Sequence, residues 1–316
     1  MPAYSEKITL ISGNAHLALA QAISKSLSIP LAAAYIGRFP DGEIDIKVND
    51  DLRGSDCFVI QPTCPPVNEN LMELLVMVDA LRRASAARIT AVMPYYGYAR
   101  QDKKHAPRAP ITGRLVADLL QAAGVHRVLA LDLDADQIEG FFQIPVDHLR
   151  ALPLFAEYLS GKELAEAVVV APDDGAVKPA YQLAERLHLP LAVVFRRGQP
   201  YGGGMLTQVV GDVTGRVPVL IDRIVDTPDR MCMALDAVRE RGARPEAFVC
   251  ATHGVLVEGT VDALFRDDVR EIVLTNSIPI PPDKCGEQMR VLSSAPLLAR
   301  AMRNVHLNES VSTLFG

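Results

Sequence analysis

Short apolar runs alternate with amphipathic segments of helical length along the whole chain. The strands predicted in the first half are 8–11, 56–61, 88–93 and 128–132, and the predicted helices are 15–27, 70–85 and 112–123. The segments 30–35 and 44–48 predict an additional hairpin. Strands that alternate with helices in this way are typical of βαβ units on a parallel sheet.

The second half repeats this plan after a predicted helix at 153–159. Its predicted strands are 167–170, 191–195, 217–221, 247–251 and 271–275, and its predicted helices are 176–187, 226–241 and 295–305. A chain of 316 residues is longer than a single hydrophobic core usually supports. We therefore expect two α/β domains, each with a doubly wound parallel sheet. We place them at 1–150 and 151–316, and the last helix is a candidate for packing back on the first domain.

Composition narrows the classes of partner. The formal net charge is −6 and only 5% of the residues are aromatic, which argues against a nucleic-acid partner. The chain has no window of eighteen uninterrupted apolar residues, which a membrane-spanning helix would need. A soluble cytoplasmic protein is therefore expected. The five cysteines form no C-x-x-C pair, and we expect reduced thiols rather than disulfides or a zinc site.

Polar residues gather where the predicted strands end. Examples are Asp132 and Asp134 after one strand, Asp173 and Asp174 after another, and Asp222 after a third. In open α/β sheets, ligands bind outside the carboxyl ends of the strands. Helix N-caps favour the same residue types, which is the alternative explanation for part of this set.

The segment 95–111 is a loop rich in cations. It holds Arg100, Lys103, Lys104 and Arg108 against the single acid Asp102. Arginine forks and lysine point charges both suit polyphosphate oxygens, so the segment predicts a phosphate-binding loop. A solvated surface turn is the alternative.

The run from Asn70 to Thr112 closely resembles the corresponding span of the ribose-phosphate pyrophosphokinase (phosphoribosyl-pyrophosphate synthase) family. Shorter segments resemble that family in the same order: FPDGEI at 39–44, QIEGFFQIPVD at 137–147, THG at 252–254, LTNSI at 274–278 and ESVSTLF at 309–315. The resemblance implies two domains of the type I phosphoribosyltransferase fold. It also implies the transfer of a pyrophosphoryl group from ATP to O1 of ribose 5-phosphate, with Mg²⁺, in nucleotide precursor synthesis.

By this resemblance, two segments bind ATP. Phe39, Asp41 and Glu43 from one subunit, with Arg100, Gln101 and Asp102 from its neighbour, would hold the nucleotide. A site shared in this way implies a homo-oligomer, in this family a hexamer built from dimers. A core phenylalanine and a simple turn at 40–42 are the alternatives for the first segment.

The resemblance also implies metal ligands. The family's DLHA reads DLDA here, with Asp134 in the place of the histidine, and the family's SPDAGG reads APDDGA, which keeps Asp173. Carboxylate oxygens suit Mg²⁺, so metal binding through Asp134 and Asp173 is expected.

The catalytic loop departs from the family pattern. The family has a lysine and, two residues on, an arginine, whereas this chain has Phe195 and Arg197. Arg196 could substitute, but neighbouring residues of a strand point to opposite faces. The loss of one transition-state donor typically costs about 100- to 1,000-fold in rate.

The ribose-phosphate loop is altered as well. The family's DDxxDTxGT reads DRIVDTPDR, which keeps Asp222, Asp226 and Thr227. Pro228 removes an N–H donor and the carboxylate of Asp229 repels a phosphate. Arg230 is expected to compensate by binding the phosphate of ribose 5-phosphate directly.

The family's allosteric phosphate site is also expected to change. Asp51, Asp136 and Glu139 stand where neutral polar residues are usual, and they predict an anionic pocket that repels phosphate.

Three functions are compatible with these features. The first is a phosphoribosyl-pyrophosphate synthase with weak activity alone. The second is a non-catalytic regulatory or scaffolding paralogue of an active synthase in mixed oligomers. The third is a phosphoribosyltransferase, against which the ATP loop and the two-domain length argue.

Overall fold

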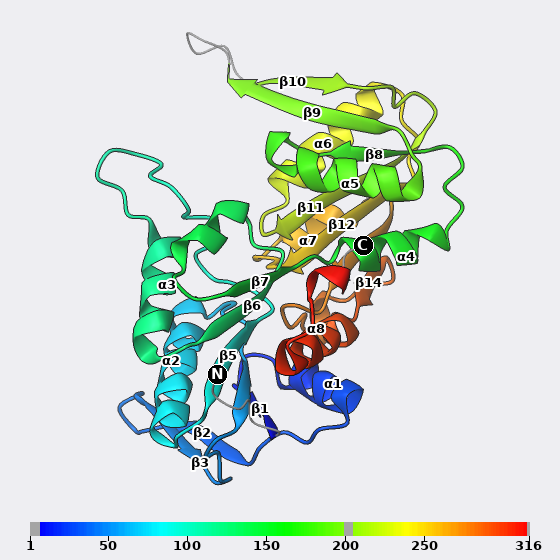
Figure 1. Cartoon of the computed structure of the whole chain (residues 1–316). Helices are drawn as coiled ribbons and strands as arrows, with labels where there is room; N and C mark the ends of the chain where they lie inside the picture. The colour runs from blue at the N-terminus through cyan, green and yellow to red at the C-terminus, as the bar shows by residue number, and fades with distance from the viewer. Residues whose placement is uncertain (1–6, 199–204, 315–316) are drawn as a thin grey trace. The chain divides into compact units, whose positions relative to one another are not determined.

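The computed structural model describes residues 7–198 and 205–314 of the chain, which divides into two compact units (Figure 1). The first unit comprises the residues up to Arg150 together with Ser277–Pro279 and the segment from Ser293 on. The second comprises Ala151–Asn276 and Ile280–Leu292. The chain therefore leaves the first unit, builds the second, and returns to complete the first.

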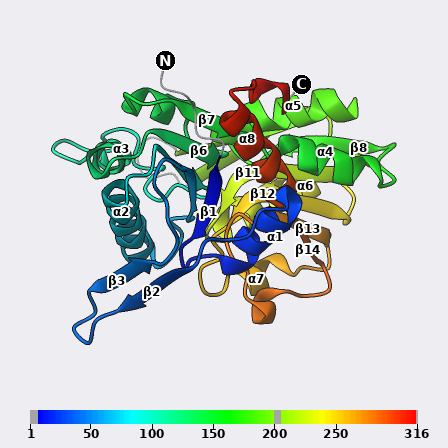
Figure 2. The same cartoon turned by 60° about the horizontal axis from the view of Figure 1, so that its bottom comes forward.

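A five-stranded parallel sheet forms the centre of the first unit. In spatial order its strands are β1 (Ile8–Ser12), β4 (Asp56–Ile60), β5 (Arg88–Met93), β6 (Arg127–Leu131) and β7 (Val146–Leu149). Its helices are α1 (Leu17–Leu27), α2 (Val67–Arg83), α3 (Thr112–Ala123) and α8 (Ala295–Leu307), with short 3₁₀ turns at Asp136–Phe141 and Ser312–Leu314. Figures 1 and 2 show α2 and α3 on one face of this sheet and α1 and α8 on the other. The first sheet is thus doubly wound.

Alternate strand residues build the core beneath α2 and α3. Cys57 and Val59 of β4 and Ala91 of β5 are buried in one cluster, because every second side chain of a strand faces the same side. Leu74 of α2 and Val116 of α3 pack into this cluster from the helices. The antiparallel hairpin of β2 (Ala34–Arg38) and β3 (Ile44–Val48) forms a separate small sheet.

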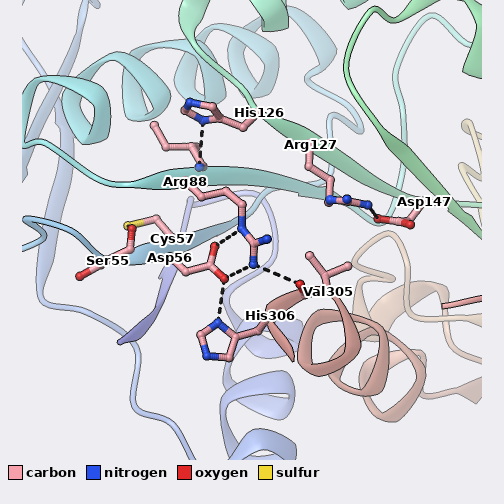
Figure 3. A network of polar contacts seen from close by, with 10 residues as sticks. Ser55, Asp56, Cys57, Arg88, His126, Arg127, Asp147, Val305 and His306 are labelled. Atoms are coloured by element: carbon pink, nitrogen blue, oxygen red, sulfur yellow. Dashed lines mark hydrogen bonds and ion pairs between the residues drawn. The ribbon is translucent and has the colours of Figure 1, made fainter. Parts of the chain in front are cut away.

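A network of charged side chains holds α8 at the amino ends of the strands (Figure 3). Asp56 and Arg88 are register partners at the first positions of β4 and β5. Arg88 Nε donates to Asp56 Oδ1 at 2.8 Å, and a second contact joins Nη2 to Oδ2. His306 Nδ1 lies 2.8 Å from Asp56 Oδ2, and Arg88 Nη2 donates to the carbonyl oxygen of Val305 at 3.1 Å. The Asp56 side chain is only 3% exposed, so this is a buried ion pair.

A seven-stranded sheet forms the second unit. In spatial order its strands are β10 (Met205–Val210), β9 (Leu191–Gly198), β8 (Ala167–Ala171), β11 (Val217–Val225), β12 (Ala247–Gly254), β13 (Val269–Thr275) and β14 (Met289–Leu292). Its helices are α4 (Leu152–Ser160), α5 (Val177–Leu187), α6 (Asp229–Glu240) and α7 (Thr260–Leu264), with 3₁₀ turns at Asp174–Ala176 and Pro282–Lys284. All strand pairs are parallel except β9 with β10. The α/β fold with parallel sheets is therefore confirmed, with an antiparallel strand at one edge.

Several element predictions were wrong in detail. The first hairpin strand is β2 rather than 30–35, and β7, β10, β14 and α7 were not predicted. Helix α6 begins at Asp229 rather than Asp226, because β11 continues to Val225. No helix in the described ranges is long and apolar enough to cross a membrane.

Candidate functional site

Two carboxylates lie near the carboxyl ends of neighbouring strands in the second unit. Asp222 lies in β11, and Asp173 follows β8, the parallel neighbour of β11. Asp222 Oδ1 accepts a hydrogen bond from the backbone N–H of Arg223 at 2.7 Å. Asp173 Oδ1 accepts from the N–H of Ala176 at 3.1 Å and so caps the turn that begins α5. Both carboxylates are therefore fixed by the backbone.

The guanidinium of Arg230 contacts both of these carboxylates. Arg230 Nη1 lies 3.2 Å from Asp173 Oδ2, and Nη2 lies 2.9 Å from Asp222 Oδ2. Nη2 also donates to the carbonyl oxygen of Ile224 at 2.8 Å. Partial burial acts to lower the pKa of Arg230, but the carboxylates of Asp222 and Asp173 outweigh it and hold the pKa above its ordinary value. Arg230 is thus a cation with two anionic partners.

The loop between β11 and α6 has a fixed backbone. Asp226 Oδ1 accepts from the N–H of Thr227 at 2.8 Å, and the Asp226 carbonyl accepts from Thr260 Oγ1 at 2.8 Å. Helix α6 begins directly after Pro228, which has no N–H to offer an anion. The sequence-predicted residues Asp222, Asp226, Thr227 and Arg230 therefore lie on one strand end, loop and first helical turn.

Phe195 lies on β9 and is 43% exposed. An aromatic ring with this exposure is not part of the core. Arg196 and Arg197 pair with Thr207 and Leu206 of β10 through the strand register. The side chains of these two arginines fall outside the described residues, so their predicted catalytic role stays a prediction.

In the first unit, Phe39 stands on the tight turn of the β2–β3 hairpin. The Phe39 N–H donates to the Glu43 carbonyl at 2.8 Å, and Asp41 Oδ1 accepts from the Glu43 N–H at 3.1 Å. Gly42 has φ 94°, in the left-handed region that favours glycine. The Phe39 side chain is 48% exposed, which excludes the alternative of a core phenylalanine.

The cationic loop after β5 is anchored to the start of α3. Gln101 Oε1 accepts from Thr112 Oγ1 at 2.5 Å, and the Gln101 carbonyl accepts from the Gly113 N–H at 3.1 Å. Asp102 accepts from Gln137 Nε2. Arg100 is exposed. Gln101 therefore ties the loop to the start of α3, and Arg100 lies at the surface.

The hairpin and this loop lie at opposite ends of the first unit. Figures 1 and 2 both show the β2–β3 tip away from the loop that joins β5 to α3. One copy of the unit therefore does not bring Phe39, Asp41 and Glu43 together with Arg100, Gln101 and Asp102.

Comparison with known proteins identifies the chain. Residues 8–124 match the N-terminal domain of ribose phosphate pyrophosphokinase, and residues 205–316 match the phosphoribosyl synthetase-associated domain. The ribose-phosphate pyrophosphokinase of Caldanaerobacter subterraneus is 46% identical over 100% of both chains, and that of Bacillus subtilis is 45% identical over 99% of this chain and 98% of the relative. This chain belongs to the ribose-phosphate pyrophosphokinase family.

A solved structure of the family has the same fold. The crystal structure of phosphoribosylpyrophosphate synthetase from Mycobacterium smegmatis superposes with a TM-score of 0.90 at 42% identity. It covers 96% of this chain and 100% of its own. The two-unit α/β architecture described above is therefore that of the ribose-phosphate pyrophosphokinases.

The two metal ligands expected by resemblance to the family differ in their surroundings. Asp134 follows β6 in the first unit and is partly exposed, so its oxygen chemistry fits Mg²⁺. Asp173 lies in the second unit, where Arg230 and the Ala176 N–H already contact its carboxylate. Among residues 7–198 and 205–314, no group of three or more His, Cys, Asp or Glu side chains is placed to hold a metal ion. The contacts of Asp173 therefore make it a poor fit for Mg²⁺, whereas the metal role of Asp134 stays a prediction.

Two of the three acids expected to make the allosteric pocket anionic lie beside basic side chains. Asp136 Oδ1 lies 3.0 Å from Arg150 Nη2, and Glu139 Oε1 lies 2.6 Å from His148 Nδ1. His148 Nε2 accepts from the Leu133 N–H at 2.8 Å, which leaves Nδ1 as the ring atom that faces Glu139. Arg150 offsets the charge of Asp136, a contact that the sequence alone did not reveal, and the expected repulsion of phosphate stays a prediction.

Proposed function

We propose that this chain makes phosphoribosyl pyrophosphate and AMP from ATP and ribose 5-phosphate, with weak turnover when it acts alone. The family and the fold support the reaction. The exposed Phe195 on β9, at the position of the family's catalytic lysine, supports the weak turnover. Because ATP and ribose 5-phosphate are cytoplasmic metabolites, we place the protein in the cytoplasm.

The proposed ATP site is shared between two copies of the chain. Phe39 is exposed on a rigid turn and can stack on the adenine, while the carboxylates of Asp41 and Glu43 can accept hydrogen bonds from an exocyclic amine. Arg100, Gln101 and Asp102 of a second copy would complete the site, since one copy keeps the two segments apart. The active form on this proposal is a homo-oligomer, a hexamer built from dimers.

The proposed acceptor site is the loop that follows β11. Asp222 and Asp226 can accept hydrogen bonds from sugar hydroxyls, and Thr227 lies at the start of the turn that would face the 5′-phosphate. In the reaction, O1 of ribose 5-phosphate attacks the β-phosphorus of ATP and gives up its proton to solvent, and the bond from that phosphorus to the oxygen shared with the α-phosphate breaks. AMP leaves with that oxygen. A bound Mg²⁺, held by Asp134 and the phosphates, would supply positive charge to the phosphate oxygens.

The proposed transition-state donors are Arg197 and Arg196. A lysine at position 195 would add a third positive charge near the moving group, whereas the phenyl ring of Phe195 adds none. The expected cost is about 100-fold to 1,000-fold in kcat, because pyrophosphoryl transfer depends on positioning and electrostatic stabilisation.

The experiment measures AMP release from ATP plus ribose 5-phosphate by the unchanged chain and by Phe195→Lys. We expect Phe195→Lys to raise kcat at least about tenfold with little change in KM, because a transition-state charge is restored. Phe195→Met is the matched control, which removes the ring without adding charge and should leave kcat unchanged. Turnover by the unchanged chain near 10 per second, roughly the median for enzymes, would contradict the proposal.

A second function, regulation of an active synthase, is favoured by the separation of the two ATP-binding segments. Because a second copy must supply one segment, an active paralogue could supply it in a mixed oligomer. Mixing the chain with such a synthase would then change AMP release per active subunit. A monomer at micromolar concentration in light scattering, both for the chain alone and for its mixture with the synthase, would exclude an ATP site shared with a second copy or with a paralogue.

A further inference from the structure

Arg230 occupies the space between two carboxylates that belong to separate strands. Its Nη1 contacts Asp173 after β8, and its Nη2 contacts Asp222 in β11. Asp222 is the more buried of the two, with 8% of its side chain exposed. A carboxylate with so little access to water needs a partner of opposite charge.

The guanidinium is also fixed by a third contact. Nη2 donates to the carbonyl of Ile224, the next-to-last residue of β11. Arg230 itself is the second residue of α6, so the helix start fixes where its side chain begins. A planar fork with two nitrogens on one side suits two carboxylates better than the point charge of a lysine does.

We propose that Arg230 is the permanent counter-ion of Asp173 and Asp222, and that its guanidinium takes the place that a divalent cation could otherwise occupy between these carboxylates. Arg230 is on this proposal a positioning residue, which acts on the acceptor through Asp222. This differs from the sequence-based expectation that Arg230 binds the phosphate of ribose 5-phosphate itself. It also means that Asp173 does not serve as a ligand of Mg²⁺ in this chain.

An arginine and a divalent cation bring different charges to the two carboxylates. One arginine contributes a single positive charge to two carboxylates, so the three groups keep a net charge of about −1. A divalent cation there would meet repulsion from the guanidinium, which at about 4 Å amounts to one or more factors of ten in affinity at a partly buried site. Removing the guanidinium should therefore open a cation site that the unchanged chain lacks.

The test is a titration of Mn²⁺, followed by the paramagnetic signal of the free ion, on full-length protein without nucleotide or ribose 5-phosphate. We expect Arg230→Met to bind Mn²⁺ at least about tenfold more tightly at one additional site per chain than the unchanged protein does. Arg244→Met is the matched control, because it removes an arginine that pairs with exposed Glu166 elsewhere in the second unit. It should gain no site.

Further variants locate the gained site. In the Arg230→Met background, Asp173→Asn and Asp222→Asn should each abolish the gain, whereas Arg230→Lys should show none because a cation remains. Asp173→Asn in the otherwise unchanged chain should leave Mn²⁺ binding unaltered. This variant tests the proposal even if Arg230→Met does not fold. An Arg230→Met protein that gains no site, or an unchanged chain that loses one on Asp173→Asn, would overturn the proposal.

This inference rests on the proposed function only in naming Asp222 as an acceptor-site group. The titration measures no turnover, so an inactive chain can still pass it. Conversely, an active chain can fail it, and the two proposals are therefore separable.

Discussion

Two of the arginine–carboxylate networks in the chain lie at opposite ends of parallel strands, one in each unit. In the first unit, Arg88 binds Asp56 at the amino ends of β4 and β5 (Figure 3). In the second unit, Arg230 binds Asp173 and Asp222 at the carboxyl ends of β8 and β11. The chemistry of the pairs is similar, but their surroundings differ.

The two networks differ in how far other parts of the chain cover them. Asp56 is 3% exposed, and α8 covers it through His306 and the Val305 carbonyl. The Arg230 side chain is 32% exposed at the end of the sheet where ligands bind in open α/β folds. We therefore expect the pair at the amino ends to serve stability and the pair at the carboxyl ends to serve the proposed acceptor site.

The largest effect is expected from Arg88→Met. The change leaves the buried Asp56 carboxylate without its main partner and removes a hydrogen bond to α8, so the free energy of unfolding should fall by about 3–5 kcal/mol. Urea denaturation followed by circular dichroism measures it. Arg83→Met is the control, since Arg83 pairs with Asp79 on the surface of α2 and should change stability little. A loss in Arg88→Met no larger than in the control would show that the network does not stabilise the first unit.

A smaller effect is expected from Arg230→Met, a stability loss of about 1–2 kcal/mol, because its partners are more exposed to water. The labelling rates of two buried thiols, Cys57 and Cys250, measure which of the two units opens. Burial raises the pKa of Cys57 in β4 to about 12 and also raises the pKa of Cys250 in β12, so both react only after opening. Arg230→Met should speed labelling of Cys250, and Arg88→Met that of Cys57, as measured by peptide mass after thiol labelling at pH 8. Equal acceleration of both thiols by either change would contradict the division of roles.

The smallest effect concerns His126 beside the Arg88 network. Burial lowers the pKa of His126, and the positive charge of Arg88 lowers it further. Its Nδ1 accepts from the Ile89 N–H at 3.1 Å, which requires a neutral ring. The unfolded chain therefore binds a proton at higher pH than the folded chain, and stability should fall as the pH drops below the ordinary value of about 6.5.

His126→Asn should remove this part of the pH dependence, by about 1 kcal/mol or less. The measurement is a series of urea denaturations between pH 7.5 and pH 5 on both proteins. Parallel curves for the two proteins across that range would show that His126 contributes nothing.

The sequence predicted the central strands of each sheet because burial on both faces makes them continuous apolar runs. β8 and β4 are buried along their whole length. The unpredicted strands β7, β10 and β14 are each at the edge of a sheet. β14 exposes Arg290 and Val291, and a strand with so few buried residues has no clear periodic signal in the sequence.

The candidate sites were predicted from motifs, but their contacts were not. The contact of Arg230 with Asp222 depends on the turn into α6, and its contact with Asp173 depends on the pairing of β8 with β11. Asp136 and Arg150 are likewise brought together by the strand and turn that separate them. Spacing along the chain indicates which residues are present, whereas register and turns decide which of them meet.

The return of the chain to its first unit has a consequence for synthesis on the ribosome. Helix α8 packs on α1, and its residues His306 and Val305 complete the network around Asp56, yet it is made after the whole second unit. At about 5–20 residues per second, the nascent first unit waits roughly 8–30 seconds between the translation of Arg150 and that of α8. During that interval the face of α1 that receives α8 is uncovered.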